Sequence, residues 1–271
     1  MDYLEQLFSD EIVKALGWTI LHSLWQGTMI ALLLALLMVF LHRHSSTVRY
    51  FISATALVTV LVLSVVTFAG LYSTLQKPFE YTGSEAATIR YIPNISGGYT
   101  MYTAPQEEES FWSTFTAFVD YFNQHLPLIV TLWMMGVAVL ALRFLGGLAY
   151  VQRLKSYRTK ILPEIWEKRM RTIAKKLAIR KKVKLLESSM VKVPMVIGHL
   201  KPVILLPIGT VTGLSVKQIE AILAHELAHV ARNDYVLNIF QSIIDIVFFY
   251  HPAVWWISAS VRSERENCCD D

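Results

Sequence analysis

The segment His225-Glu226-Leu227-Ala228-His229 combines residue types and a spacing that suit metal-dependent hydrolysis. Histidines four positions apart project from one face of a helix, so both imidazoles can bind a single Zn²⁺ ion. Glu226 stands beside that metal, where its carboxylate can take a proton from a water molecule whose pKa the metal has lowered. The other interpretation of so short a motif is a surface helix with ordinary polar pairs.

A helix that begins after Ser215 is expected to carry the motif. Ser215 and Gln218 fit a capping box, in which each side chain accepts a hydrogen bond from the backbone N–H of the other residue. Apolar residues then recur at helical spacing, at Ile219, Ile222, Leu223 and Leu227. The side chains of Ala224 and Ala228 are small and leave room for a metal beside the histidines. These features favour the metal site over the surface helix.

A third protein ligand is needed, because a catalytic zinc site holds three ligands and leaves one position open. The candidates lie downstream of the motif, and they are Asp245, His251, Glu264, Glu266, Cys268, Cys269 and Asp270. Two roles are open to Asp234, directly after the motif helix: the support of a ligand histidine or the capping of a helix. The residue types alone leave both questions open.

These residues stand in a chain whose composition is typical of a membrane protein. Of its 271 residues 54% are hydrophobic and 17% are charged, whereas a soluble domain carries about 25% charged residues. Three uncharged stretches exceed the roughly 20 residues that a helix needs to cross a bilayer, at 15–42, 50–76 and 121–142. The composition excludes a disordered, fibrous or ordinary cytosolic protein. Because the first residues are acidic where a signal peptide is basic, we expect the first stretch to remain in the membrane.

The distribution of charge predicts which ends of these helices face the cytoplasm. The short loop after the first stretch contains two arginines. Residues 73–125 carry two basic and six acidic residues, whereas residues 150–192 carry fourteen basic and three acidic residues. Since Lys and Arg favour the cytoplasmic side, we expect the N-terminus and the loop 73–125 outside. The organisation expected is a membrane domain of residues 1–149 and a cytoplasmic domain of residues 150–271.

The cytoplasmic part is expected to combine helices with a few strands. Apolar residues recur among the basic ones, at Ile165, Met170, Ile173 and Leu177. Their spacing predicts an amphipathic helix beside the inner leaflet of the membrane. Short β-like runs follow at 183–186, 193–197 and 202–206. No nucleic-acid-binding module is recognisable in the basic region, so we expect no direct contact with nucleic acid. The fold class expected is mostly α and polytopic, with three transmembrane helices and an α+β cytoplasmic domain.

The chain also contains longer motifs around these residues. They are HELAH followed by R-N-D, then FYHPAVWW, then R-x-E-R-E-x-C-C-D-D, and upstream VPMVIGHLKPVILLP and WTILHSLWQG. Together they resemble the BlaR/MecR antirepressor family of membrane zinc metallopeptidases, and the resemblance runs over most of the chain. It implies a zincin-like metalloprotease domain with Zn²⁺ as its cofactor.

The resemblance also implies which residues complete the site. In this family the third zinc ligand is the Glu of an E-x-x-x-D motif, which Glu266 and Asp270 match. Glu266 is then a ligand, and Asp270 orients a ligand histidine, a role that metal sites generally require. Glu264 is the competing ligand, unless it forms an ion pair with a neighbouring arginine. Cys268 and Cys269 are expected to be structural.

With Glu266 as ligand, the hydrophobic stretch after the motif helix is expected to form a helical hairpin over 235–266. A single crossing of the bilayer would instead place Glu266 about 30 Å from the motif, although both must reach one metal. Pro252 interrupts the helix and allows a turn. The two arms, 235–250 and 253–266, would be about 24 Å and about 21 Å long, so the second returns to where the first began.

The leading hypothesis is a zinc endopeptidase in a bacterial inner membrane, with its active site on the cytoplasmic side. Glu226 would assist the attack of water on a peptide carbonyl, and the strand 193–197 could hold an extended substrate by strand addition. The resemblance implies signal transduction by cleavage of a cytoplasmic transcriptional repressor or of the chain itself. The alternatives are a quality-control protease of the HtpX type and a catalytically silent transducer that zinc only braces. The expected partners are the lipid bilayer and a protein substrate.

Overall fold

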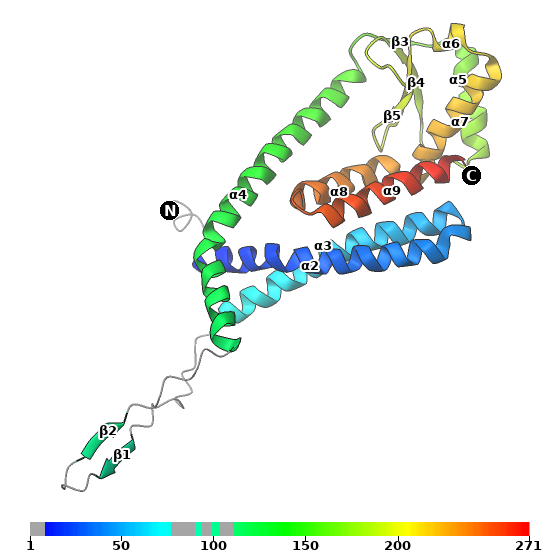
Figure 1. Cartoon of the computed structure of the whole chain (residues 1–271). Coiled ribbons are helices and arrows are strands. Elements are labelled where there is room, and N and C mark those ends of the chain that lie inside the picture. Colours follow the sequence, from blue (N-terminus) through cyan, green and yellow to red (C-terminus); the bar gives the residue numbers. More distant parts are fainter. Residues whose placement is uncertain (1–8, 77–89, 94–98, 103–110, 271) are drawn as a thin grey trace. The chain divides into compact units, whose positions relative to one another are not determined.

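The computed structural model describes residues 9–76, 90–93, 99–102 and 111–270 and is predominantly helical (Figure 1). Its helices are α2 (Asp10–Phe40), α3 (Ser46–Leu75), α4 (Phe111–Leu154), α5 (Glu164–Lys176), α6 (Thr210–Gly213), α7 (Val216–Arg232), α8 (Asp234–Val247) and α9 (Pro252–Asp270), with a 3-10 turn η1 (Leu41–Arg43). Its strands are β1 (Arg90–Pro93), β2 (Tyr99–Tyr102), β3 (Thr159–Ile161), β4 (Lys184–Ser188), β5 (Met195–Ile197) and β6 (Val203–Pro207). The expected fold class, mostly α and polytopic, is confirmed, and the structure adds a small mixed sheet in the C-terminal part.

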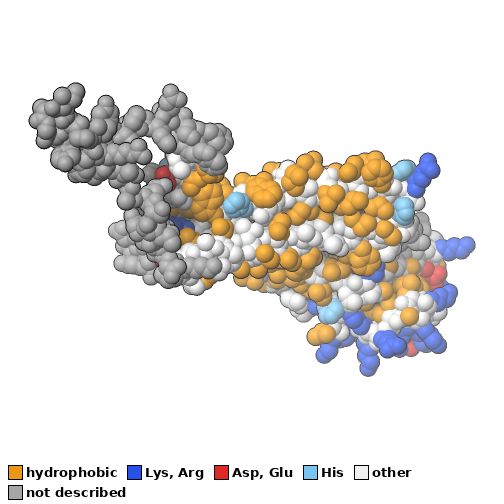
Figure 2. All heavy atoms as spheres, turned by 90° about the horizontal axis from the view of Figure 1, so that it is seen from below, with side chains coloured by type: hydrophobic (Ala, Val, Ile, Leu, Met, Phe, Trp, Pro, Cys, Tyr) orange, Lys and Arg blue, Asp and Glu red, His pale blue; other side chains and the backbone are white. Residues whose placement is uncertain are grey.

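Three helical segments of the described residues are long and apolar enough to cross a membrane, Asp10–Arg43, Ser46–Leu75 and Phe115–Leu154. The face shown in Figure 2 is dominated by hydrophobic side chains, and Lys and Arg side chains gather at one end of it. The three segments correspond to the stretches expected from the sequence, although α4 extends well beyond 121–142 at both ends. Hydropathy missed these extensions because they contain polar residues, which end an apolar run but not a helix.

A four-stranded sheet lies in the C-terminal part of the chain, with the strand order β3-β4-β6-β5. Strands β4 and β6 are parallel, whereas β3 and β5 run antiparallel to their neighbours. The three β-like runs of the sequence correspond to β4, β5 and β6. The short strand β3 was not expected, nor was the antiparallel pair β1–β2, because strands of three or four residues are too short to show alternation. Among the residues that the structure describes, strand β5 pairs only with β6, and it is an edge strand of this sheet.

Helices α5 and α7 pack on the sheet (Figure 1). Helix α5 is the amphipathic helix expected from the basic region, and Met170 on its apolar face is buried. The buried cluster between these elements consists of Leu162, Met170, Leu185, Ile204, Leu206, Ile219, Leu223 and Leu227. Burial of this apolar face fixes α7, which carries the HExxH motif, against the sheet.

Helices α8 and α9 form the expected hairpin, and they lie side by side in Figure 1. Pro252 is the first residue of α9, a position where proline costs no helical hydrogen bond. Between the arms, Gln241 Nε2 donates to both the backbone oxygen and the hydroxyl of Ser258, each at 2.7 Å. A buried amide is satisfied in this way, so the two arms are held in one register.

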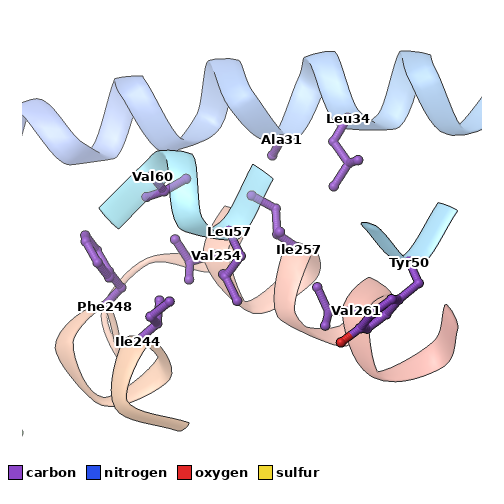
Figure 3. Packing of buried hydrophobic residues seen from close by; sticks show 10 residues of the cluster. All are labelled: Ala31, Leu34, Tyr50, Leu57, Val60, Ile244, Phe248, Val254, Ile257 and Val261. Atoms are coloured by element: carbon purple, nitrogen blue, oxygen red, sulfur yellow. The ribbon is translucent and has the colours of Figure 1, made fainter. Parts of the chain in front are cut away.

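The hairpin packs against α2 and α3 through a hydrophobic cluster (Figure 3). The buried members are Ala31, Leu34, Tyr50, Leu57, Val60, Ile244, Phe248, Val254, Ile257 and Val261. They come from all four helices, and none of these side chains is more than 8% exposed. The apolar faces of α8 and α9 are therefore covered by the first two membrane-type helices.

The turn of the hairpin makes polar contacts with the middle of α2. His251 Nε2 donates to the backbone oxygen of Ser23 at 2.9 Å, and the hydroxyls of Tyr250 and Ser23 share a hydrogen bond of 2.7 Å. Gly27 makes the close approach possible, because a Cβ atom there would overlap the ring of His251. The turn is thus seated on α2 at one defined point.

We expect Gly27→Ala to destabilise the protein by about 1–3 kcal/mol, because the added methyl group displaces the buried His251 ring. Thermal unfolding in detergent measures the effect. Gly70→Ala is the matched control, since a Cβ atom at that helical position meets nothing within 4 Å. In the control the gain in helix propensity should raise stability by up to about 1 kcal/mol. Equal stability of the two variants would contradict the assigned contact.

The contacts divide the chain into two compact units, one of residues 1–21 with 65–132 and one of residues 22–64 with 133–271. In the first unit, the indole of Trp18 donates to Asn123 Oδ1 at 2.9 Å. The second unit contains the hairpin, the sheet and the motif helix. The boundary expected after residue 149 separates a membrane domain from a cytoplasmic domain, which is a different division from that into compact units. It stays a prediction.

Candidate metal centre

Helix α7 begins with the capping box that the sequence predicts. Ser215 Oγ accepts a hydrogen bond from the backbone N–H of Gln218, and the Gln218 side chain accepts one from the N–H of Ser215. The apolar stripe of α7 faces the sheet, so the motif histidines are left on the neighbouring face, partly exposed. Local sequence and core packing together decide where the two imidazoles point.

The side chains of His225, His229 and Glu266 converge on one point. Glu266 Oε2 lies 3.9 Å from His225 Nε2 and 3.7 Å from His229 Nε2. The candidate ligand atoms of the three residues all lie within 4.8 Å of one another. Ligand atoms about 2.1 Å from a tetrahedral zinc ion are about 3.4 Å apart, so small side-chain adjustments suffice. Two imidazoles and a carboxylate are a donor set that zinc accepts with a fourth position open, and these residues therefore fit Zn²⁺.

Glu266 lies near the two histidines because the C-terminal part of α9 is hydrogen-bonded to the end of α7. The guanidinium of Arg232, the last residue of α7, donates to the backbone oxygen of Arg265 at 3.1 Å. This contact joins the helix of the two histidines to the backbone beside the third candidate ligand. The role of Arg232 was not anticipated from the sequence, although its R-N-D segment belongs to the longer motifs.

Glu264, the competing third ligand, points away from the centre. Its carboxylate forms an ion pair of 3.2 Å with Arg49 of α3, and both side chains are largely buried. It also accepts a hydrogen bond of 3.3 Å from Asn267. The ion-pair interpretation was anticipated, but with a neighbouring arginine rather than with Arg49. The geometry favours Glu266 over Glu264 as the ligand.

Asp234 supports one of the two histidines. Its Oδ2 atom accepts hydrogen bonds from His229 Nδ1 at 2.7 Å and from Arg232 at 2.9 Å. Burial raises the pKa of Asp234, but these two hydrogen bonds and the charge of Arg232 outweigh burial and hold the pKa below its ordinary value. A carboxylate that accepts from Nδ1 favours the tautomer of His229 in which Nε2 carries the lone pair that can bind a metal. Of the two roles left open for Asp234, this is the supporting one.

We expect Asp234→Ala to weaken zinc binding about 10–100-fold, because His229 loses the partner that orients its ring. Competition with a chelator of known affinity measures the change. Glu220→Ala is a suitable control, since this carboxylate belongs to α7, the helix of the two histidines, but pairs with Arg169 of α5. Equal zinc affinity in the two variants would show that the hydrogen bond has no part in metal binding.

Asp270 lies at the end of α9, but its side chain and that of Cys269 are outside the described residues. The role of Asp270 stays a prediction. Cys268 is partly buried and its thiol approaches the hydroxyl of Thr47 at 3.9 Å. This cysteine packs against the hydrophobic cluster of the hairpin rather than facing the histidines.

Glu226 is buried beside the candidate ligands, with 8% of its surface exposed. Burial raises the pKa of its carboxyl group, and the neighbouring histidines His229 and His225 oppose this effect only in part. A raised pKa brings a carboxylate closer to the range in which a general base both takes and releases a proton. Glu226 therefore has the environment that the motif requires of its central glutamate.

These residues line a pocket of about 410 Å³. Its lining comes from the edge strand β5, represented by Met195 and Val196, from α7 and from the beginning of α8. Lys181 and His199 close one side, where the Lys181 ammonium group contacts His199 Nδ1 at 3.3 Å and the side-chain oxygen of Asn233. The pocket thus places an unpaired strand edge next to the candidate metal ligands.

The remaining candidate ligands lie in the hairpin and do not join the group of three. Asp245 pairs with Arg262 of the other arm at 3.1 Å. His251 is buried in the turn and bound to α2. Both residues have structural partners.

Comparison with known proteins agrees with these observations. The chain matches the family model described as BlaR1 peptidase M56 over residues 18–271. It is 29% identical over 138 residues to the "Regulatory protein BlaR1" of Bacillus licheniformis. The aligned residues make up 51% of this chain and 23% of that protein. It is 26% identical over 144 residues to the "Methicillin resistance mecR1 protein" of Staphylococcus aureus. Here the aligned residues make up 53% of this chain and 24% of that protein. The matched region spans about a quarter of the length of these relatives. Because the family model covers nearly the whole chain, the resemblance seen in the sequence is confirmed, and the chain belongs to the BlaR1 peptidase M56 family.

Proposed function

We propose that this chain is a zinc-dependent endopeptidase of a bacterial inner membrane, with its active site on the cytoplasmic side. The observation that carries the proposal is the convergence of His225, His229 and Glu266 in a pocket that also contains the buried Glu226. A zinc ion that only braces a fold has no use for a buried carboxylate beside its ligands. Membership of a peptidase family supports the same chemistry.

The residues of the pocket have separate roles in this proposal. When His225, His229 and Glu266 hold it, Zn²⁺ supplies Lewis-acid chemistry that polarises a peptide carbonyl and lowers the pKa of a water molecule. Glu226 takes the proton of the attacking water and passes it to the leaving amine. Asp234 keeps the His229 ring in the tautomer whose Nε2 atom binds the metal.

Strand β5 is the proposed docking edge for the substrate backbone. It is an edge strand, and its residues Met195 and Val196 line the pocket of the candidate ligands. An extended peptide that adds to this edge gains main-chain hydrogen bonds and lies across the pocket near Glu226. Such docking requires no free chain end, which suits an endopeptidase.

The cytoplasmic placement of the site is supported by charge and by contacts. The short loop between α2 and α3 is basic, and basic loops favour the cytoplasm. Arg49 near the start of α3 pairs with Glu264, two residues before Glu266. The candidate ligand therefore lies at the basic end of the helices, and we propose that the N-terminus and the segment 73–125 are outside.

The biological role that we propose is signal transduction. The relatives are named as a regulatory protein and as a methicillin resistance protein. We extend to this chain the cleavage of a repressor-type protein, or of the chain itself, as the transmitted event. The HtpX-type quality-control protease remains the second candidate for the same chemistry.

Hydrolysis of an unstructured soluble protein, casein, tests the proposed activity. The full chain in lipid nanodiscs, loaded with zinc, is expected to cleave casein, to stop when a chelator removes the metal, and to resume when zinc is restored. If the zinc-loaded chain leaves both casein and itself intact, a silent transducer braced by zinc is the better account.

A further inference from the structure

The pocket of the candidate metal ligands contains one more histidine, which has no part in the chemistry proposed above. His199 lies in the turn between β5 and β6 and lines the pocket together with His225, Glu226 and His229. It does not belong to the group of three candidate ligands. Its side chain is partly exposed. The pocket thus offers a polar ring beside the candidate metal site that the metal does not require.

The backbone of β5 leads directly to His199. The lining of the pocket follows β5 through Met195 and Val196 and continues at Gly198. Gly198 has φ of 93°, a conformation that residues with a side chain rarely adopt, and it turns the chain out of the strand at this point. A peptide that adds to the edge of β5 therefore runs past the turn that carries His199.

A lysine holds the ring of His199. The ammonium group of Lys181 lies 3.3 Å from His199 Nδ1, and it also donates to the side-chain oxygen of Asn233. Asn233 is the residue between α7 and α8. Lys181 therefore ties the turn after β5 to the end of the helix that carries the two candidate ligand histidines.

The contact with Lys181 decides which nitrogen of His199 carries the proton. An ammonium group can donate a hydrogen bond but cannot accept one, so His199 Nδ1 is the acceptor. In a neutral imidazole the proton then lies on Nε2. This Nε2 atom has no hydrogen-bond partner among the described residues, and it is not enclosed by them. It is thus an N–H donor that a molecule in the pocket can reach.

The geometry points to His199 Nε2 as the donor of a hydrogen bond to the carbonyl oxygen of the scissile peptide, with Lys181 as the positioning residue. The inference rests on the proposed peptidase function and adds these two residues to it. The attack of water places negative charge on the carbonyl oxygen, and a fixed donor stabilises this charge more than it stabilises the uncharged substrate. His199 keeps its proton, because Glu226 transfers the proton of the water to the leaving amine.

The kinetics of cleavage of a casein peptide separate this role from a structural one. In the zinc-loaded full chain, His199→Leu removes the donor and should lower kcat about 10²–10³-fold with little change in KM. His199→Gln should recover part of the loss, since its amide can donate from nearly the same place. Lys181→Met should lower kcat by about tenfold, an effect expected when a reacting group loses the partner that orients it. Lys182→Met is the matched control, because this neighbour is exposed and outside the pocket lining.

Two results would overturn the inference. One is a kcat for His199→Leu close to that of wild type. The other is the loss of zinc from both His199 variants, measured by elemental analysis, because His199 would then be a metal ligand. The control Lys182→Met should keep the kcat, the KM and the zinc content of wild type.

Nitrogen NMR of the metal-free full chain, labelled in its histidines, tests the contact without any need for activity. The signals of His199 are those that disappear in His199→Gln, and in wild type they should show the proton on Nε2. Lys181→Met should give a mixture of both tautomers, whereas Lys182→Met should not. A proton on Nδ1 in wild type would overturn the inference and leave the proposed peptidase function intact. If wild type has the proton on Nε2 but cleaves no peptide, the peptidase proposal fails and the catalytic role of His199 fails with it.

Discussion

Glu226→Gln is expected to lower peptide hydrolysis by about 10²–10⁴-fold, the usual contribution of a general base. The amide has the shape of the carboxylate but cannot take a proton from water. Because Glu226 is not among the three converging ligand residues, zinc binding should be retained. Initial rates of casein cleavage and zinc content of the same preparation measure the two effects.

A surface variant on the same helix provides the control for this result. Glu220→Gln removes a carboxylate that pairs with Arg169, and it should leave the rate close to that of wild type. The control also reveals a contaminating protease, which would cleave casein equally in every preparation. A Glu226→Gln variant that retains zinc and half of the wild-type rate would mean that another group acts as the base.

Glu266→Ala is expected to reduce zinc from about one ion per chain to a trace, since two histidines alone hold a catalytic zinc weakly. Elemental analysis of the purified full chain measures this directly. Glu264→Ala is the matched control, because this residue lies on the same helix and its carboxylate pairs with Arg49. The control should keep its zinc.

The opposite result would change the assignment of the site. If zinc survives the loss of Glu266 and disappears with Glu264, the ion pair with Arg49 is not the resting state of the metal-loaded protein. If it survives both substitutions, the third ligand comes from elsewhere. The thermal stability of metal-free protein, compared between the two variants, shows whether either substitution acts through folding.

The parts of the fold that could be predicted from the sequence are those determined by neighbouring residues. Ser215 and Gln218 are three positions apart, and their capping box needs no information from the rest of the chain. The apolar stretches of α2 and α3 can likewise be recognised in the sequence by their length and composition. The hairpin followed from one break, at Pro252, and from the requirement that Glu266 reach the histidines.

The parts that escaped prediction depend on contacts between distant segments or on an unusual backbone conformation. Arg49 and Glu264 pair across more than two hundred positions, and no local pattern indicates such a contact. Asp234 is close to His229 in sequence, but it reaches the ring because Asn233 adopts a left-handed conformation, with φ of 61°. This conformation turns the chain sharply between α7 and α8, and asparagine tolerates it better than most residues.

The packing of the hairpin on α2 and α3 has a consequence for the whole protein. Glu266 is carried by α9, whose buried residues Val254, Ile257 and Val261 rest on α2 and α3. A fragment that lacked these two helices would leave an apolar face of α9 uncovered and its carboxylate without a fixed position. The membrane helices therefore cannot be exchanged for an arbitrary anchor. They support the candidate active site through α9, and a shift of either helix would displace Glu266, the third candidate ligand.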